Sequence, residues 1–170
     1  YILICLLPAI SFLLTIQFSG QKSMIAKFVV AHVILILMAL NIHHVFPDYN
    51  VLETLQIKQR DFYNVAELWN AGSAIDIGRL DPNLWSFIKH IPQALASTFF
   101  RPHLLEADSA LLFASALENL AIVILLVFYI LHFKNAKKEN IPWVLFSLSF
   151  VIFLALLIGW TTPIMGALVR

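Results

Sequence analysis

Long apolar stretches alternate with short polar ones along this chain. Four of them approach the roughly 20 residues that an α-helix needs to cross a bilayer. They cover residues 1–18, 24–46, 109–133 and 142–160. Because backbone groups in hydrocarbon need internal hydrogen-bond partners, we expect these stretches to be helices. The pattern therefore predicts an all-α, polytopic membrane protein with four transmembrane helices, forming a single helical membrane domain over residues 1–170.

The connection between the second and third stretches, residues 47–108, has a different pattern. From Val51 to Asn70, apolar side chains recur mostly at every third or fourth position, with polar side chains between them. This spacing predicts an amphipathic helix. The sequence Ala71–Gly72–Ser73 follows it, and Gly72 is a natural C-terminal stop.

A second outer helix is predicted further along this connection. Asp81 and Pro82 form a typical N-cap and first-turn pair, so we expect a helix from Pro82 to about Phe100. Pro92 should kink or restart it. Its large apolar face suits the bilayer interface or the tops of the spanning helices.

Composition agrees with a lipid environment. The chain is 61% hydrophobic and 12% charged, whereas soluble domains average about 45–50% and 25%. The near-neutral charge gives no argument for nucleic acid as a partner. The single cysteine, Cys5, excludes an internal disulfide. Both ends of the chain lie in or beside apolar stretches, so we expect it to be part of a larger polytopic protein.

Positive charge predicts the orientation of the spans. Loop 19–23 contains Lys22, and loop 134–141 contains Lys134, Lys137 and Lys138. If all four stretches cross, both loops face the same side, which the positive-inside rule makes cytoplasmic. Residues 47–108 would then be periplasmic or extracellular. We expect a multi-pass protein of the plasma (inner) membrane, with the lipid bilayer as its first partner.

Glu118 is an ionisable residue within the third apolar stretch. It lies about 14 Å along that helix, close to the middle of a bilayer. A carboxyl group there costs about 2.5–3.5 kcal/mol, so we expect it to face the bundle interior and to be paired or protonated. It is either a substrate, ion or proton site or a buried carboxyl that joins two helices.

A polar cluster precedes the third stretch. Arg101 suits bidentate binding of phosphate or carboxylate, and His103 or Glu106 suits proton transfer. The alternative is an anchor at the membrane boundary, where Pro102 turns the chain.

His43 and His44 end the second stretch on the same predicted face of the membrane as this cluster. Asp48, Thr161, Thr162 and Arg170 are placed near that face too. Adjacent histidines on a helix point about 100° apart, and no zinc-ligand spacing occurs. We therefore expect no metal or other cofactor. His32, deep in the second stretch, is expected to be a neutral, hydrogen-bonded helix contact rather than part of a proton relay.

Several short motifs over residues 50–170 resemble one group of proteins. They are Gly72–Ser73, Leu80–Asp81–Pro82, Trp85–Ser86–Phe87, Pro92–Gln93–Ala94–Leu95, Phe100–Arg101–Pro102, Ala116–Leu117–Glu118–Asn119 and Thr161–Arg170. The group is one of uncharacterised polytopic inner-membrane proteins of Bacteroidetes-type bacteria, found near envelope-polysaccharide glycosyltransferases. The resemblance implies a role in polysaccharide assembly, but no catalytic residue. Leu105 departs from the pattern, since members often have an aromatic residue there.

Three functions follow as hypotheses. The first is a role in cell-envelope polysaccharide or lipid-linked sugar assembly, in which Arg101 meets an anionic glycan or phosphate and Glu106 and Glu118 are acidic partners. The second is a transporter or flippase with an intramembrane carboxylate. The third is a non-catalytic scaffold that binds other membrane subunits. The sequence leaves open whether the chain is an enzyme.

Overall fold

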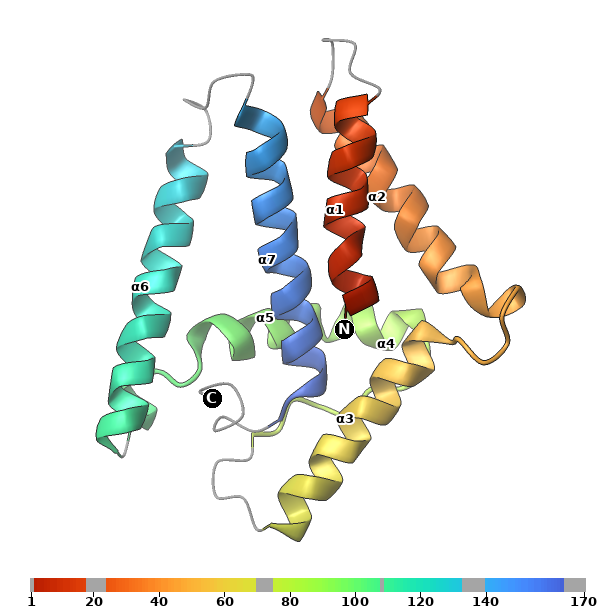
Figure 1. Ribbon diagram of the computed structural model, residues 1–170. Coiled ribbons are helices and arrows are strands. Elements are labelled where there is room, and N and C mark those ends of the chain that lie inside the picture. Colours follow the sequence, from red (N-terminus) through yellow and green to blue (C-terminus); the bar gives the residue numbers. More distant parts are fainter. Residues whose placement is uncertain (1, 18–23, 70–74, 108, 133–139, 164–170) are drawn as a thin grey trace. The chain divides into compact units, whose positions relative to one another are not determined.

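A computed structural model describes residues 2–17, 24–69, 75–107, 109–132 and 140–163 (Figure 1). Every regular element in these ranges is helical, as predicted. The elements are α1 (Ile2–Gln17), α2 (Met24–Asn41), η1 (Ile42–His44), α3 (Val51–Leu68), α4 (Leu84–Lys89), α5 (Ile91–Phe100), η2 (Leu104–Glu106), α6 (Ala110–His132) and α7 (Ile141–Thr161).

Some sequence predictions lie outside the described residues. They concern loop 19–23, most of loop 134–141, the helix stop at Ala71–Ser73, and Arg170.

Among the residues that the structure describes, three helices are long and apolar enough to cross a membrane, whereas the sequence predicts four. They are Met24–His44, Ala110–His132 and Ile141–Thr161. The fourth prediction, residues 1–18, corresponds to α1, whose 16 residues extend about 24 Å. That length is less than the roughly 30 Å of a hydrocarbon core. The apolar pattern predicted this helix, and residues 1 and 18 of the prediction lie outside the described part of the chain.

The apolar side chains of these helices are mostly exposed. Only 11–17% of the most apolar window in each of the three long helices is buried. On α1 the arrangement is inverted relative to a soluble protein, because Ser11 and Thr15 are buried whereas Leu13 and Ile16 are exposed. Soluble proteins rarely expose apolar surface on this scale. The exposure supports a membrane location.

The chain forms two compact units. The first contains residues 1–51 and 132–154, and the second contains residues 52–131 and 155–170. In the first unit, α1 packs against α2. Phe12 of α1 also contacts Trp143 of α7, with ring centroids 4.5 Å apart.

His32 lies inside this first unit, as expected of a helix contact. Its Nδ1 donates to the carbonyl oxygen of Phe28 at 3.1 Å. Its ring also stacks on Phe153, with centroids 5.8 Å apart.

The helices between α2 and α6 largely follow the prediction. α3 begins at Val51, and its buried residues include Leu55, Gln59 and Ala66. The second outer helix is divided at His90 into α4 and α5, with Pro92 in the first turn of α5. The expected N-cap at Asp81 is wrong. Asn83 caps α4, because its side-chain oxygen accepts a hydrogen bond from the Ser86 amide at 2.8 Å.

In the same unit, α5 crosses the last turns of α7 closely. Ala94 on α5 and Ala155 on α7 are 2% and 3% exposed. A Cβ atom on Gly159 would overlap the carbonyl oxygen of Ala94. Thr98 donates a hydrogen bond to the Ala155 carbonyl at 2.8 Å. Small residues thus allow the two backbones to approach, as at many membrane helix crossings.

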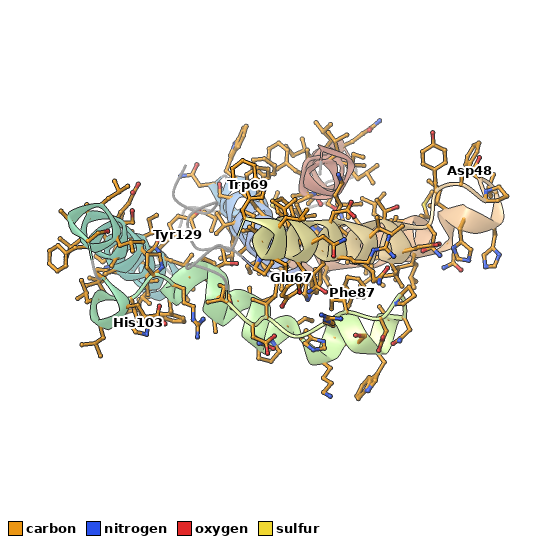
Figure 2. All side chains as sticks on the ribbon, turned by 90° about the horizontal axis from the view of Figure 1, so that it is seen from below. Asp48, Glu67, Trp69, Phe87, His103 and Tyr129 are labelled. Carbon is orange, nitrogen blue, oxygen red and sulfur yellow. The ribbon has the colours of Figure 1, made fainter. Side chains whose placement is uncertain are left out.

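In the same unit, Phe87 of α4 (labelled in Figure 2) is buried. It meets Trp160 of α7 edge to face, with ring centroids 5.2 Å apart.

Candidate functional site

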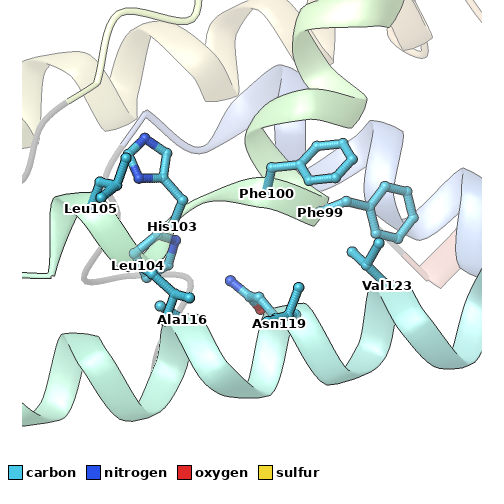
Figure 3. Close-up of a pocket in the computed structure, with 10 residues that line it drawn as sticks. Phe99, Phe100, His103, Leu104, Leu105, Ala116, Asn119 and Val123 are labelled. Atoms are coloured by element: carbon cyan, nitrogen blue, oxygen red, sulfur yellow. The ribbon is translucent and has the colours of Figure 1, made fainter.

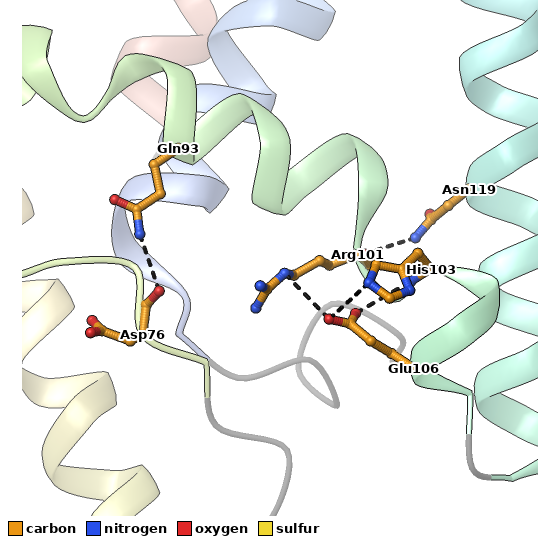
Figure 4. Close-up of polar contacts among 6 residues, drawn as sticks. All are labelled: Asp76, Gln93, Arg101, His103, Glu106 and Asn119. Atoms are coloured by element: carbon orange, nitrogen blue, oxygen red, sulfur yellow. Dashed lines mark hydrogen bonds and ion pairs between the residues drawn. The ribbon is translucent and has the colours of Figure 1, made fainter.

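The connection between α5 and α6 contains a compact polar cluster (Figure 4). α5 ends at Phe100 and Arg101 is its C-cap, so the side chains that follow are presented by a short irregular segment. Arg101 Nε lies 3.7 Å from Glu106 Oε1. His103 Nε2 lies 3.1 Å from the same oxygen. The structure therefore brings together three of the six residues singled out from the sequence.

The backbone of η2 fixes the position of Glu106. Glu106 Oε2 accepts a hydrogen bond from the His103 amide at 3.4 Å. The Glu106 amide in turn donates to the His103 carbonyl at 2.9 Å. Because both residues sit on the same short turn, the carboxylate is held between the imidazole and the guanidinium.

Asn119 joins this segment to α6. Its side-chain amide donates a hydrogen bond to the carbonyl oxygen of Arg101 at 2.8 Å. Asn119 lies nine residues after Ala110, which is about 13 Å along the helix. The cluster is thus held beside the third turn of α6 rather than beyond its end. If α6 spans the bilayer, this position is within the membrane thickness.

An apolar cavity adjoins the cluster (Figure 3). Its volume is about 300 Å³. Its lining residues are Phe99, Phe100, Pro102, His103, Leu104, Leu105, Ala116, Asn119, Leu120 and Val123. The four from α6 are spaced by three and four, so one face of that helix forms a wall. His103 and Asn119 give this otherwise apolar cavity its polar edge.

Two of the apolar side chains that line this cavity, Phe100 and Leu105, are also exposed. Leu105 is 96% exposed and Phe100 is 58% exposed, with Leu111 also exposed nearby in the sequence. Contiguous exposed apolar groups of this kind suit contact with lipid.

The polar cluster is suited to two kinds of chemistry, anion binding and proton transfer. In Figure 4 the terminal amino groups of Arg101 point away from Glu106, so they remain available to an anion. A guanidinium binds phosphate or carboxylate through two parallel hydrogen bonds. His103 and Glu106 form a hydrogen-bonded imidazole–carboxylate pair, which is suited to moving a proton.

Glu118 does not join this cluster. It lies on α6 next to Asn119 but is exposed, whereas we expected it to face the bundle interior. The physical reason is that Ala116, Asn119 and Val123 form the packed face of α6. Glu118 is about 160° from Ala116 at 100° per residue.

His43 and His44 belong to the first unit, whereas the cluster belongs to the second. Their rings lie 4.1 Å apart, centroid to centroid, on the short helix η1. His43 Nδ1 donates to the Leu40 carbonyl at 2.9 Å. Within the described ranges, no three His, Cys, Asp or Glu side chains are grouped so that they could hold a metal ion.

The sequence pattern did not predict the polar network that connects α3 to the 78–80 segment and to the end of α7. Gln59 donates to the carbonyl oxygens of Gly78 (2.9 Å) and Trp160 (2.8 Å), and it accepts from the Leu80 amide (2.8 Å). Nearby, the Tyr63 hydroxyl accepts from the Ile77 amide at 3.1 Å. In the sequence, this network is recognisable only as polar positions on the predicted amphipathic helix.

Tyr63 also donates a hydrogen bond to Asp76 Oδ1, at 3.4 Å. Burial of the phenol raises the pKa of Tyr63 above its usual range, and the negative charge of Asp76 adds to this effect. Tyr63 is therefore a neutral structural group, not a candidate base.

Comparison of the chain with protein-family models, with curated proteins and with solved structures finds no match.

Proposed function

We propose that this chain is a multi-pass inner-membrane protein that binds a lipid-linked anionic sugar, or its phosphate-bearing lipid carrier, during assembly of a cell-envelope polysaccharide. In this proposal all four apolar stretches cross the membrane, and residues 47–108 face the periplasm. The anionic group binds Arg101 and His103, and the lipid chain occupies the cavity between α5 and α6.

The observation that carries the proposal is the adjacency of two chemistries. His103 lines the apolar cavity of about 300 Å³ and also belongs to the polar cluster. Asn119 lines the same cavity and holds the cluster through its hydrogen bond to Arg101. A soluble anion would leave the apolar cavity empty, and a neutral lipid would leave the Arg101 guanidinium without an anionic partner. A molecule that has both an anionic group and a long hydrocarbon chain uses both features.

The resemblance described above supplies the link to polysaccharide assembly, and its implied role agrees with this ligand chemistry. Lipid-linked sugars are built on a phosphate attached to a polyprenyl chain. The His103–Glu106 pair is placed beside the bound phosphate, where it adjusts the charge and hydrogen bonding of that group. Binding does not depend on any further transfer step.

Binding of a polyprenyl phosphate to the purified chain in nanodiscs tests the proposal. Val123→Trp fills the cavity, and Arg101→Gln removes the cation. Losing a charged hydrogen bond costs about 1.5–3 kcal/mol, so Arg101→Gln is expected to weaken binding roughly tenfold to a hundredfold. Native mass spectrometry or a fluorescent competitor gives the affinity of each variant.

The matched control for Val123→Trp is Ile130→Trp, which adds the same bulk at an exposed position of α6 outside the cavity. It should bind as the wild type does. The wild type should bind the uncharged polyprenol about as weakly as the Arg101→Gln variant binds the polyprenyl phosphate. Equal affinities of the wild type for the phosphate and the alcohol would contradict the proposal.

A second function, a scaffold that binds other membrane subunits, is favoured by a different observation. Glu118 is exposed on an apolar helix. A scaffold role is compatible with lipid binding at the other face of α6.

A further inference from the structure

The α6 face that contains Glu118 is separate from the lipid site. Leu111, Ala114, Glu118, Ala121 and Leu125 recur at three- or four-residue intervals, which places them on one side of the helix. All five are exposed. The opposite side carries Ala116, which is 2% exposed, together with the other cavity residues.

Glu118 is a carboxylate in an otherwise uncharged helix. α6 contains no Asp, Lys or Arg, and Glu118 lies about 12 Å from its first residue. In the part of the chain that the structure describes, no ion pair or hydrogen bond involves its side chain. Lipid tails offer a carboxylate neither a donor nor a counter-charge, so ionisable groups at this depth face a partner or a water-filled space.

The neighbours of Glu118 make room for a helix. Ala114 lies one turn before it and Ala121 lies one turn after it, and both are exposed. Small residues at this spacing let a second helix approach closely, as Gly159 and Ala94 do in the crossing of α7 and α5. The carboxylate would then sit at the centre of the contact.

We propose that this face of α6 binds a membrane-spanning helix of a partner protein that carries an Arg or Lys side chain at the depth of Glu118. Charge complementarity selects this occupant over others. A second copy of the chain that packed α6 on α6 would place two Glu118 carboxylates against each other, and like charges repel. A lipid would leave the carboxylate without a partner.

A synthetic transmembrane peptide tests this proposal with the full chain. The probe is a polyleucine helix with one central Arg and a dansyl group, in neutral phosphatidylcholine vesicles. Energy transfer from the four tryptophans of the chain reports binding. Interhelical polar contacts in bilayers lead us to expect that the Arg peptide binds roughly five- to thirtyfold more tightly than an all-leucine peptide.

Glu118→Leu and Glu118→Gln should each reduce this preference, and Glu118→Leu should abolish it. The matched control combines Glu118→Leu with Leu117→Glu, which moves the carboxyl by about 100° around the helix. It should not restore the preference.

Three results would overturn the proposal. One is equal binding of the Arg and leucine peptides to the wild type, and another is a preference that persists in Glu118→Leu. The third is a peptide with central Glu that binds as tightly as the Arg peptide, which would identify a second copy as the occupant. Because lipid binding uses the opposite face of α6, its failure leaves this test unaffected.

Discussion

At the scale of single residues, Gln59 connects α3 to the 78–80 segment and to the last turn of α7. Its side chain is 3% exposed and hydrogen-bonds to both the 78–80 segment and the last turn of α7. An amide has both donors and an acceptor, so one side chain satisfies two carbonyl oxygens and one N–H. An apolar residue of similar size would leave all three backbone groups buried without partners.

Gln59→Leu is therefore expected to lower the free energy of unfolding by roughly 2–4 kcal/mol, since each unsatisfied buried group costs about 1–3 kcal/mol and some relaxation occurs. Unfolding in mixed micelles, followed by circular dichroism, measures the change. Gln56→Leu makes the same substitution one turn earlier on α3 and should change stability by less than about 1 kcal/mol. Equal effects of the two substitutions would contradict the role of Gln59.

At the scale of helices, the crossing of α5 and α7 depends on the absence of a side chain at Gly159. The backbone of α5 occupies the space that a Cβ atom would need. Because the clash involves backbone rather than a flexible side chain, neither partner can adjust by changing a rotamer. Steric exclusion at this point sets the distance between the two helices.

Gly159→Ala should destabilise the second unit by about 1–3 kcal/mol, the usual cost of overpacking. It should also weaken the Thr98 hydrogen bond to Ala155, which spans the same crossing. Thermal unfolding of the purified chain measures the loss. Ala96→Val adds bulk on the exposed side of α5 and should leave the midpoint nearly unchanged. A Gly159→Ala variant as stable as the wild type would show that the helices are not in close contact.

Several helices could be predicted from local sequence, because their signals are local. The three-to-four spacing in α3 and the proline near the start of α5 both act within a few residues. The N-cap of α4 was placed two residues early because Asp81 and Asn83 are both good caps, and only the Ser86 hydrogen bond distinguishes them.

The packed face of α6 could not be predicted. Its apolar side chains occur all round the helix, so periodicity does not mark the side that packs. Glu118 was expected inside because a carboxyl is costly in lipid, yet Ala116 and Asn119 pack instead. The cluster of Arg101, His103 and Glu106 was found because its members are close in sequence. Its cavity depends on contacts with α6 that no local pattern encodes.

At the scale of the whole molecule, orientation in the membrane is still a prediction. The positive-inside rule predicts that the two short loops that contain Lys22 and Lys134, Lys137 and Lys138 face the cytoplasm. The single cysteine makes this prediction simple to test, because replacing Cys5 removes every native thiol.

In a Cys5→Ser background, Asp81→Cys should react with a membrane-impermeant maleimide in spheroplasts. Lys137→Cys should react only after the membrane is permeabilised, because its loop is expected to be cytoplasmic. The electrophoretic shift of a polyethylene-glycol maleimide measures both reactions. Labelling of both variants after permeabilisation is the control, and the reverse pattern in spheroplasts would invert the orientation.

The Gln59 bond to Trp160 also bears on the order of events during synthesis. The two residues are 101 positions apart, and the amide of Ile75 likewise pairs with the carbonyl of Pro163. A ribosome that adds about 5–20 residues per second needs roughly 5–20 seconds to cover that interval. During this time α3 and the 75–80 segment have been synthesised, but their acceptors, the carbonyl groups of Trp160 and Pro163, do not yet exist. The hydrogen bonds from Gln59 and Ile75 to Trp160 and Pro163 can therefore form only after α7 has been synthesised.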